Sequence, residues 1–242
     1  MKFSKFVLAL AAILVVALGT ATAAQAANPS VLPVGTEASP LSFTGKAKGV
    51  TKLIAEGRTV ECREAPAEGS IGGREFTNGR LGLVIITFKG CVSSNTACTG
   101  LERAEPEGQI KVHAIIHIWA GRLVNARGEV VLHRAVIVFL PLHVHFTCGF
   151  GLVLVLVLGC VAALISNINR LARTLESNFI ENEKREGIND ITEVENERGE
   201  FIPCSLKTAF NEGREVNSLQ TGESVAEKFK QGGREVEVLV MA

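Results

Sequence analysis

The chain has 242 residues with 25 basic and 25 acidic side chains, and it contains one tryptophan and no tyrosine. Because Lys and Arg are dispersed rather than clustered, the charge pattern gives no support for nucleic-acid binding. The only aspartate is Asp190, which excludes EF-hand loops and aspartic dyads. The scarcity of aromatic side chains argues against the sugar-stacking platform of a lectin.

The first 26 residues have the features of a secretory signal peptide. Lys2 and Lys5 precede an uncharged apolar run over residues 6–18, and small residues lead to a cleavage site after Ala26. Export permits disulfides, and all six cysteines lie beyond this site. We therefore expect a protein that is secreted or held on the exterior of the cell envelope.

The remainder divides into a short leader and one domain. Residues 27–44 contain Pro29, Pro33, Gly35 and Pro40 and no helical stripe, and they are predicted to form an irregular N-terminal leader. Residues 45–242 are predicted to form a single β-rich extracellular domain, because short apolar stretches alternate with glycine-bearing polar tips such as residues 55–57 and 196–199. This spacing is typical of an antiparallel meander.

The clearest predicted strands lie in the middle of the chain. Apolar side chains occupy the even positions from 110 to 120, and again from 130 to 146 with Arg134 as the one interruption. Period-two alternation indicates strands, and we expect each stretch to have one apolar face. Residues 83–88 and 235–241 are also predicted to be strands, while residues 171–186 fit either a helix or a strand.

The uncharged run over residues 146–165 has two interpretations. Twenty residues are enough for a helix to cross a bilayer. However, Gly149, Gly151 and Gly159 interrupt the run, and valine alternates with leucine within it, as in a strand buried on both faces. We favour the buried strand, and a membrane-anchored protein that spans residues 146–165 stays open as an alternative.

The cysteines predict a disulfide framework in an exported chain. Cys91 and Cys98 are close enough in sequence to close a small loop, so we predict that they pair. Six cysteines allow fifteen connectivities, and the residues alone do not choose among the pairings of the other four.

Several short motifs occur together in this chain: Val60-Glu61-Cys62, Thr87-Phe88-Lys89-Gly90-Cys91 followed by Cys98, Phe146-Thr147-Cys148 with a later hydrophobic strand, Asn169-Arg170-Leu171, and Phe210-Asn211-Glu212-Gly213. This arrangement resembles a group of secreted β-rich proteins of soil actinobacteria that have no established activity, and the resemblance covers most of the mature chain. It implies a β-rich extracellular domain in which Cys62 pairs with Cys148. Cys160 and Cys204 are not part of the family pattern, and the presence of both suggests an additional disulfide between them.

All five histidines fall within a short stretch and have odd numbers: His113, His117, His133, His143 and His145. Imidazoles that share a strand face are able to chelate zinc or copper, so a metal-binding module is one hypothesis. We favour the simpler interpretation, in which the histidines lie on the solvent-facing side of strands. No cysteine or carboxylate accompanies them at a recognisable ligand spacing.

The sequence contains no G-x-S-x-G elbow and no P-loop. We therefore expect a non-enzymatic protein without a cofactor, with a structural, adhesive or ligand-presenting role and a place at the cell envelope. The predicted fold is an all-β, antiparallel β-sandwich or related barrel of roughly ten strands, stapled by disulfides. The partner or ligand is not indicated by the residues.

Overall fold

The computed structural model describes residues 29–36, 38–72, 81–101, 105–124, 130–149, 151–180, 189 and 191–241. Within these residues every regular element is a β-strand, and all pairs of named strands are antiparallel. The strands that begin before residue 110 are β1 (Ser30–Leu32), β2 (Leu41–Ala47), β3 (Thr51–Ala55), β4 (Arg58–Cys62), β5 (Ala67–Ile71), β6 (Leu81–Lys89), β7 (Val92–Ser93), β8 (Thr96–Gly100) and β9 (Gln109–Val124). The later strands are β10 (Val130–Cys148), β11 (Val153–Ile165), β12 (Leu171–Ala172), β13 (Leu175–Phe179), β14 (Ile191–Glu195), β15 (Phe201–Pro203), β16 (Leu206–Phe210), β17 (Val216–Gln231), β18 (Arg234–Glu235) and β19 (Val238–Met241).

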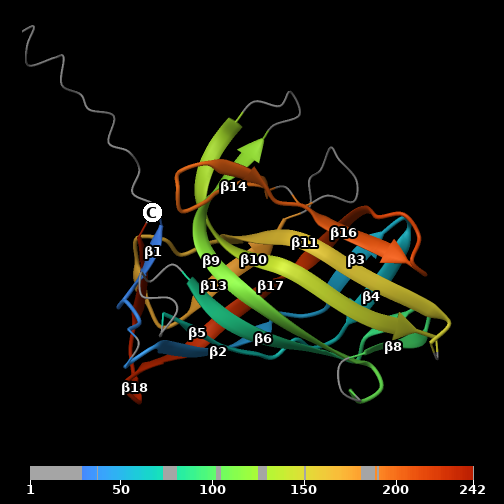
Figure 1. Cartoon of the computed structure of the whole chain (residues 1–242). Helices are drawn as coiled ribbons and strands as arrows, with labels where there is room; N and C mark the ends of the chain where they lie inside the picture. Colours follow the sequence, from blue (N-terminus) through green and yellow to red (C-terminus); the bar gives the residue numbers. More distant parts are fainter. Residues whose placement is uncertain are drawn as a thin grey trace, which may run out of the picture.

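The long strands β10 and β17 organise the fold, because three routes of hydrogen-bonded strands connect one to the other (Figure 1). The first route runs from β10 through β9, β6, β5 and β2 to β17. The second runs through β8, β7, β4 and β3. The third runs through β11, which pairs with β13 and β16, and both of these pair with β17.

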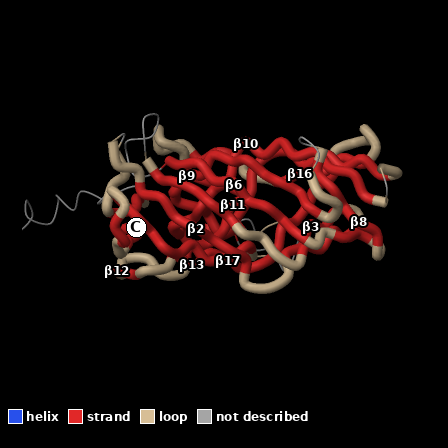
Figure 2. The backbone as a smooth tube through the Cα atoms, turned by 90° about the horizontal axis from the view of Figure 1, so that it is seen from below, coloured by secondary structure: helices blue, strands red, loops and turns tan. Residues whose placement is uncertain are grey.

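The first and second routes, together with β10 and β17, close a ring of ten strands. The predicted all-β fold of roughly ten strands is confirmed, in its barrel-like form. The ring is elongated, and Figure 2 shows many of the connecting loops at its two ends.

Alternation along the strands determines which side chains the ring encloses. On β9, Ile110, Ile116 and Ile118 are at most 4% exposed, whereas Lys111 and His113 on the opposite face are exposed. The predicted apolar face of residues 110–120 is thus confirmed. Burying each large aliphatic side chain contributes roughly 1.5–3 kcal/mol, which is what fixes the register of this strand.

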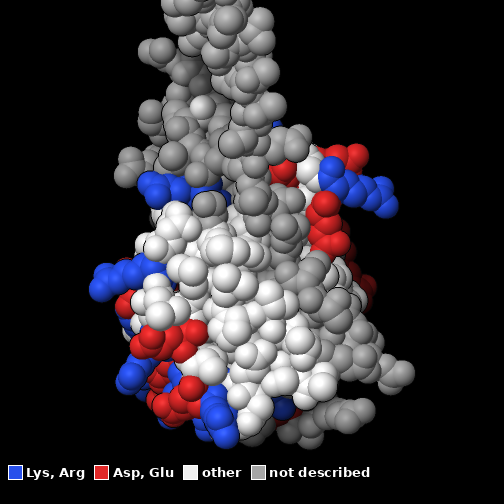
Figure 3. Space-filling model, turned by 90° about the vertical axis from the view of Figure 1, so that its left-hand side faces the viewer, with Lys and Arg blue, Asp and Glu red and all other residues white. Residues whose placement is uncertain are grey.

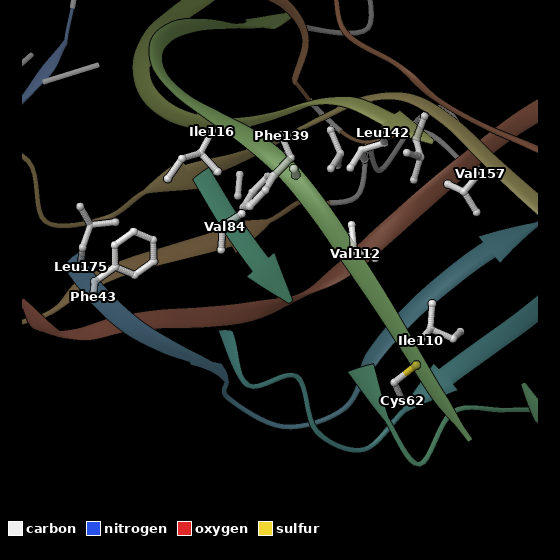
Figure 4. Close-up of a cluster of buried hydrophobic side chains, with 14 of the residues drawn as sticks. Phe43, Cys62, Val84, Ile110, Val112, Ile116, Phe139, Leu142, Val157 and Leu175 are labelled. Atoms are coloured by element: carbon white, nitrogen blue, oxygen red, sulfur yellow. The ribbon is translucent and has the colours of Figure 1, made fainter. Parts of the chain in front are cut away.

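The enclosed side chains come from all three routes and point into one interior (Figure 4). Phe43 and Val84 belong to the first route, Cys62 to the second, and Val157 and Leu175 to the third. The main core therefore holds the three routes together, and no single route forms it alone.

Strand β10 changes face at an irregularity between Phe139 and Leu142. Phe139 pairs with Val161, whereas Leu142 pairs with Gly159, so β10 has one residue more than β11 in this interval. One extra residue turns the following side chains to the other face. As a result, the odd-numbered Phe139 and the even-numbered Leu142 both belong to the main core. The prediction that the even positions from 130 to 146 form one apolar face is wrong for this reason.

Three even-numbered residues of β10 just before this irregularity, Val136, Val138 and Leu140, lie in or pack against a second hydrophobic core on the outer face of the ring. Val136 and Val138 pack there with Trp119 of β9. Strand β14 pairs with the end of β9 and contributes Ile191 and Val194, so β14 and its partner β15 cover this face. We call this group the outer core.

The uncharged segment 146–165 forms the end of β10 and the paired strand β11. Ala162 and Ala163 are 1% and 0% exposed and face the outer and the main core respectively, which confirms a strand buried on both faces. The helix on which the membrane-anchored alternative depends is absent from this segment. Across the described residues, no helix has the length and apolar character needed to cross a membrane.

The expected irregular leader is wrong in part. Residues 30–32 form β1 and pair with β19, and β2 begins at Leu41. Val31 and Leu41 are fully buried, and this burial attaches the segment to the domain. Likewise, residues 171–179 of the ambiguous stretch form β12 and β13, while residues 181–188 lie outside the described part.

Strands β1, β19 and β12 form a separate three-stranded sheet at the left-hand end of the molecule in Figure 1. Leu171 and Met241 on this sheet are 59% and 42% exposed. Figure 3 looks onto this end and shows uncharged surface bordered by Lys, Arg, Asp and Glu side chains.

Candidate ligand-binding cavity

The interior of the ring contains a cavity of about 170 Å³ that residues from all three routes line. Its wall consists mainly of aliphatic side chains and phenylalanines, the latter being Phe43, Phe88, Phe139, Phe146 and Phe179. Phe139 and Phe179 pack with their ring centroids 5.8 Å apart. An apolar cavity of about 150 Å³ in another protein stays dry and binds benzene, so this space is large enough for a small apolar molecule.

Small residues on adjacent strands create this space. Gly45 of β2 lies between Ala67 of β5 and Ala226 of β17, as the strand register pairs it with both. All three residues line the cavity. Since directly paired residues share a face of the sheet, the row leaves room where larger side chains would meet the opposing phenylalanines.

One corner of the cavity is polar. The hydroxyl groups of Ser177 and Ser224 lie 2.7 Å apart and hydrogen bond to each other, and both residues line the cavity. Ser177 is 6% exposed, and the neighbouring Thr51 is 7% exposed. One hydroxyl donates to the other, so among the described residues the O–H of the accepting serine is available to donate to a ligand.

A second cavity of about 350 Å³ lies where the hairpins β3–β4, β7–β8 and β10–β11 end. Leu53 and Val60 line both this space and the interior cavity, so the two adjoin at these side chains. Leu152 on its margin is 80% exposed, which places the second cavity at the molecular surface. We call it the mouth.

Arg58 and Phe210 face each other across the mouth. The Arg58 guanidinium carbon lies 4.5 Å from the centre of the Phe210 ring. Arg58 is an even-numbered residue of β4, like the buried Val60 and Cys62, so it stands on the inner side of that strand. Among the described residues no carboxylate pairs with Arg58, and none lines the mouth.

Four cysteines form a row beside the mouth. Cys98 stands directly opposite Cys148, and the pairing of Glu61 with Val92 places Cys62 opposite Cys91. The disulfides are Cys62–Cys91 and Cys98–Cys148, each with 4.0 Å between the Cα atoms. The predicted pairings of Cys91 with Cys98 and of Cys62 with Cys148 are therefore wrong.

The reason lies in the type of strand pair. The backbone N–H of Cys98 donates to the carbonyl of Cys91 at 2.9 Å, and hydrogen-bonded antiparallel pairs hold their Cα atoms about 5.5 Å apart, wider than the other type of pair. A Cys91–Cys98 bond would also leave Cys62 and Cys148 about 14 Å apart, three strand spacings, which is too far for a disulfide. Cys160–Cys204 forms as expected, at the edge of the outer core.

The histidines do not gather into one cluster. His143 and His145 are exposed on β10 with ring centroids 4.7 Å apart, and His113 is exposed on β9. His117 is half-buried beside Trp119, with ring centroids 4.1 Å apart. The side chain of His133 lies outside the described part. Within that part, no group of three or more His, Cys, Asp or Glu residues is placed to hold a metal ion.

The outer core contains polar atoms that lack partners. His117 Nδ1, Trp119 Nε1 and Arg122 Nε are buried without a hydrogen-bond partner among the described residues. Burial lowers the pKa of His117 from 6.5 to about 4, against the opposing effect of the Glu197 carboxylate. The expectation that the histidines face solvent is wrong for His117, because it packs beside Trp119 on the face that β14 and β15 cover.

The sequence reasoning missed the residues that shape the cavity and its mouth. The alternation of inward-facing residues along β2 and β17 does not by itself predict the row of Gly45, Ala67 and Ala226. That prediction also requires knowing which strands pair with each other. Arg58 gave no signal, because a charged residue at a hairpin tip is ordinarily solvated. Comparison of the chain with protein-family models, with characterised proteins and with solved structures gave no match.

Proposed function

We propose that this protein is a secreted, non-enzymatic carrier of small apolar molecules, which it holds in the interior cavity of the ring. The observation that carries this proposal is the cavity itself: about 170 Å³ lined mainly by phenylalanine and aliphatic side chains from three separate strand routes. Ligand sites are typically concave and apolar, with a few polar groups that orient the ligand. The polar corner at Ser177 and Ser224 supplies such groups.

The disulfides support the extracellular part of the proposal. Three disulfides persist most readily in an oxidising compartment. Two of them bridge neighbouring strands beside the mouth, so they keep one side of the ring closed when a ligand enters. A rigid wall preserves the shape of the cavity and lowers the entropic cost of binding.

Titration of the purified, oxidised chain with dodecan-1-ol, whose chain is long enough to occupy the interior cavity and the adjoining mouth together, tests the proposal. Isothermal titration calorimetry is expected to give one saturable site in the unsubstituted protein. Ala226→Leu adds bulk directly into the cavity and is expected to weaken this site by about tenfold or more. Thr44→Leu is the matched control, since it adds bulk to an exposed position on the adjacent strand β2.

Binding that is lost in Ala226→Leu and kept in Thr44→Leu supports a carrier that uses the interior. Absence of saturable binding in the unsubstituted protein, or equal binding in both variants, would overturn it. Thermal unfolding of each variant confirms that the comparison is made between folded proteins.

A further inference from the structure

We infer that the mouth binds the anionic headgroup of a single-chain amphiphile, with Arg58 as its counter-ion and the hydrocarbon tail in the interior cavity. This inference rests on the proposed function and specifies its ligand class. A carboxylate-headed chain of the fatty-acid type is the simplest molecule with this chemistry.

The first argument is continuity between the two cavities. Leu53 and Val60 are neighbours across the β3–β4 hairpin, and both line the mouth and the interior. Val155 and Phe210 continue the apolar wall of the mouth on the opposite side. A tail that enters here meets apolar side chains from the surface to the phenylalanines of the interior.

The second argument is charge. Arg58 is the only charged residue that lines the mouth among the described residues, and Ser93, Ser94 and Thr96 line the β7–β8 side of the same space. A guanidinium stacked on an aromatic ring keeps its N–H groups available at the ring edge, where they are able to form a bidentate pair with a carboxylate. The mouth is therefore complementary to one negative charge and not to a cation.

The third argument concerns the charges beside the interior cavity. Lys46 and Glu223 are among its lining residues, and Lys46 Nζ already pairs with Glu227 Oε1 at 3.3 Å, while the Ser177–Ser224 pair is neutral. A carboxylate headgroup there would have to compete with Glu227 for the only cation that lines this cavity among the described residues, and it would lie near a second carboxylate, Glu223. The headgroup accordingly stays at the mouth while the tail fills the interior, and this fixes the orientation of the ligand.

The test compares dodecanoate with dodecan-1-ol, both below the concentrations at which they self-associate. Arg58→Gln is expected to weaken dodecanoate binding by at least about tenfold, the effect of one lost charge-assisted hydrogen bond, and to change dodecan-1-ol binding by less than about twofold. Lys52→Gln is the matched control, because it removes a positive charge from the same hairpin at an outward-facing position that pairs with Glu61.

A series of carboxylates from octanoate to dodecanoate tests the position of the tail. Affinity is expected to rise by up to about fourfold for each added methylene as the tail enters the apolar interior. In Ala226→Leu, which shortens the available space, the rise is expected to stop at a shorter chain.

Three results would overturn the inference. If Arg58→Gln binds dodecanoate as tightly as the unsubstituted protein while dodecan-1-ol still binds and Ala226→Leu still blocks it, the headgroup site is wrong and the carrier function stands. If Arg58→Gln and Lys52→Gln weaken dodecanoate equally, the effect is one of overall charge. If neither amphiphile binds, the carrier function fails and the inference with it.

Discussion

The main core and the outer core lie on opposite faces of the same three strands, yet they differ in what they leave unfilled. Ile118, Ile137 and Ala163 face the main core, where space remains but the polar serines are paired. One residue along, Trp119, Val136 and Leu164 face the outer core, where Trp119 Nε1 and the nearby His117 Nδ1 have no hydrogen-bond partner among the described residues. The main core thus contains unfilled apolar space, and the outer core contains buried polar atoms that lower stability.

This difference separates binding from stability. Space in a core lowers stability because the lining side chains lose contacts, and a ligand of the right shape restores them. Buried polar atoms without partners lower stability in a way that an apolar ligand does not relieve. We therefore expect ligand binding to respond to changes in the main core and pH to act through the outer core.

Two aromatic truncations test this difference between the two cores and have the largest expected effect. Trp119→Ala and Phe139→Ala each remove a buried ring, and each is expected to reduce the free energy of unfolding by about 3–5 kcal/mol. Dodecan-1-ol is expected to stabilise Trp119→Ala only as much as it stabilises the unsubstituted protein, because this change leaves the interior cavity as it was, and to stabilise Phe139→Ala more, because its larger cavity lies in the main core. Urea denaturation with and without the alcohol measures both effects. If dodecan-1-ol stabilises the two variants equally, the proposed separation between ligand binding in the main core and stability in the outer core is wrong.

The outer core also depends on its disulfide. Cys160–Cys204 ties β11 to the residue that follows β15. Replacing both cysteines by serine is expected to reduce stability by about 2–4 kcal/mol and to leave dodecan-1-ol affinity unchanged. Denaturant unfolding and calorimetry on the same sample test this. Peptide mapping of the unsubstituted protein is expected to recover Cys62–Cys91 and Cys98–Cys148. Recovery of a Cys91–Cys98 disulfide would contradict the pairing of the four cysteines beside the mouth.

His117 is expected to make stability depend on pH. Above pH 6.5 its imidazole is neutral in both the folded and the unfolded chain, so it causes no difference between them. As the pH falls from 6.5 toward 4, the unfolded chain binds a proton that burial keeps from the folded chain, and stability falls by at most about 3 kcal/mol. His117→Phe is expected to lose this dependence in urea titrations at pH 7 and pH 4.5. If the variant keeps the same pH dependence of stability, groups other than His117 cause that dependence.

Much of the fold followed from local pattern. Alternation from Ile110 to Ala120, and the β-branched and aromatic residues from Leu83 to Phe88, predicted strands that the structure contains, since both signals are local properties of a strand. The extra residue between Phe139 and Leu142 left no such trace, so one apparent face divided between two cores. The position of a bulge depends on the partner strand, which a single sequence does not specify.

The site was harder to predict than the fold for the same reason. The cavity depends on Gly45, Ala67 and Ala226 meeting across three strands, although they lie far apart in the chain. The pairing of Cys91 was likewise decided by β4, which places Cys62 opposite it. Sequence proximity to Cys98 had suggested the wrong partner. Local chemistry predicted the strands, and long-range register determined what they enclose.

A crystal structure determined under xenon pressure tests the central claim most directly, because xenon occupies dry apolar cavities without any polar contact. We predict a xenon site inside the ring, in contact with Phe43, Phe139 and Val84, and loss of that site in Ala226→Leu. No xenon within the ring, or a site that Ala226→Leu leaves unchanged, would contradict the account.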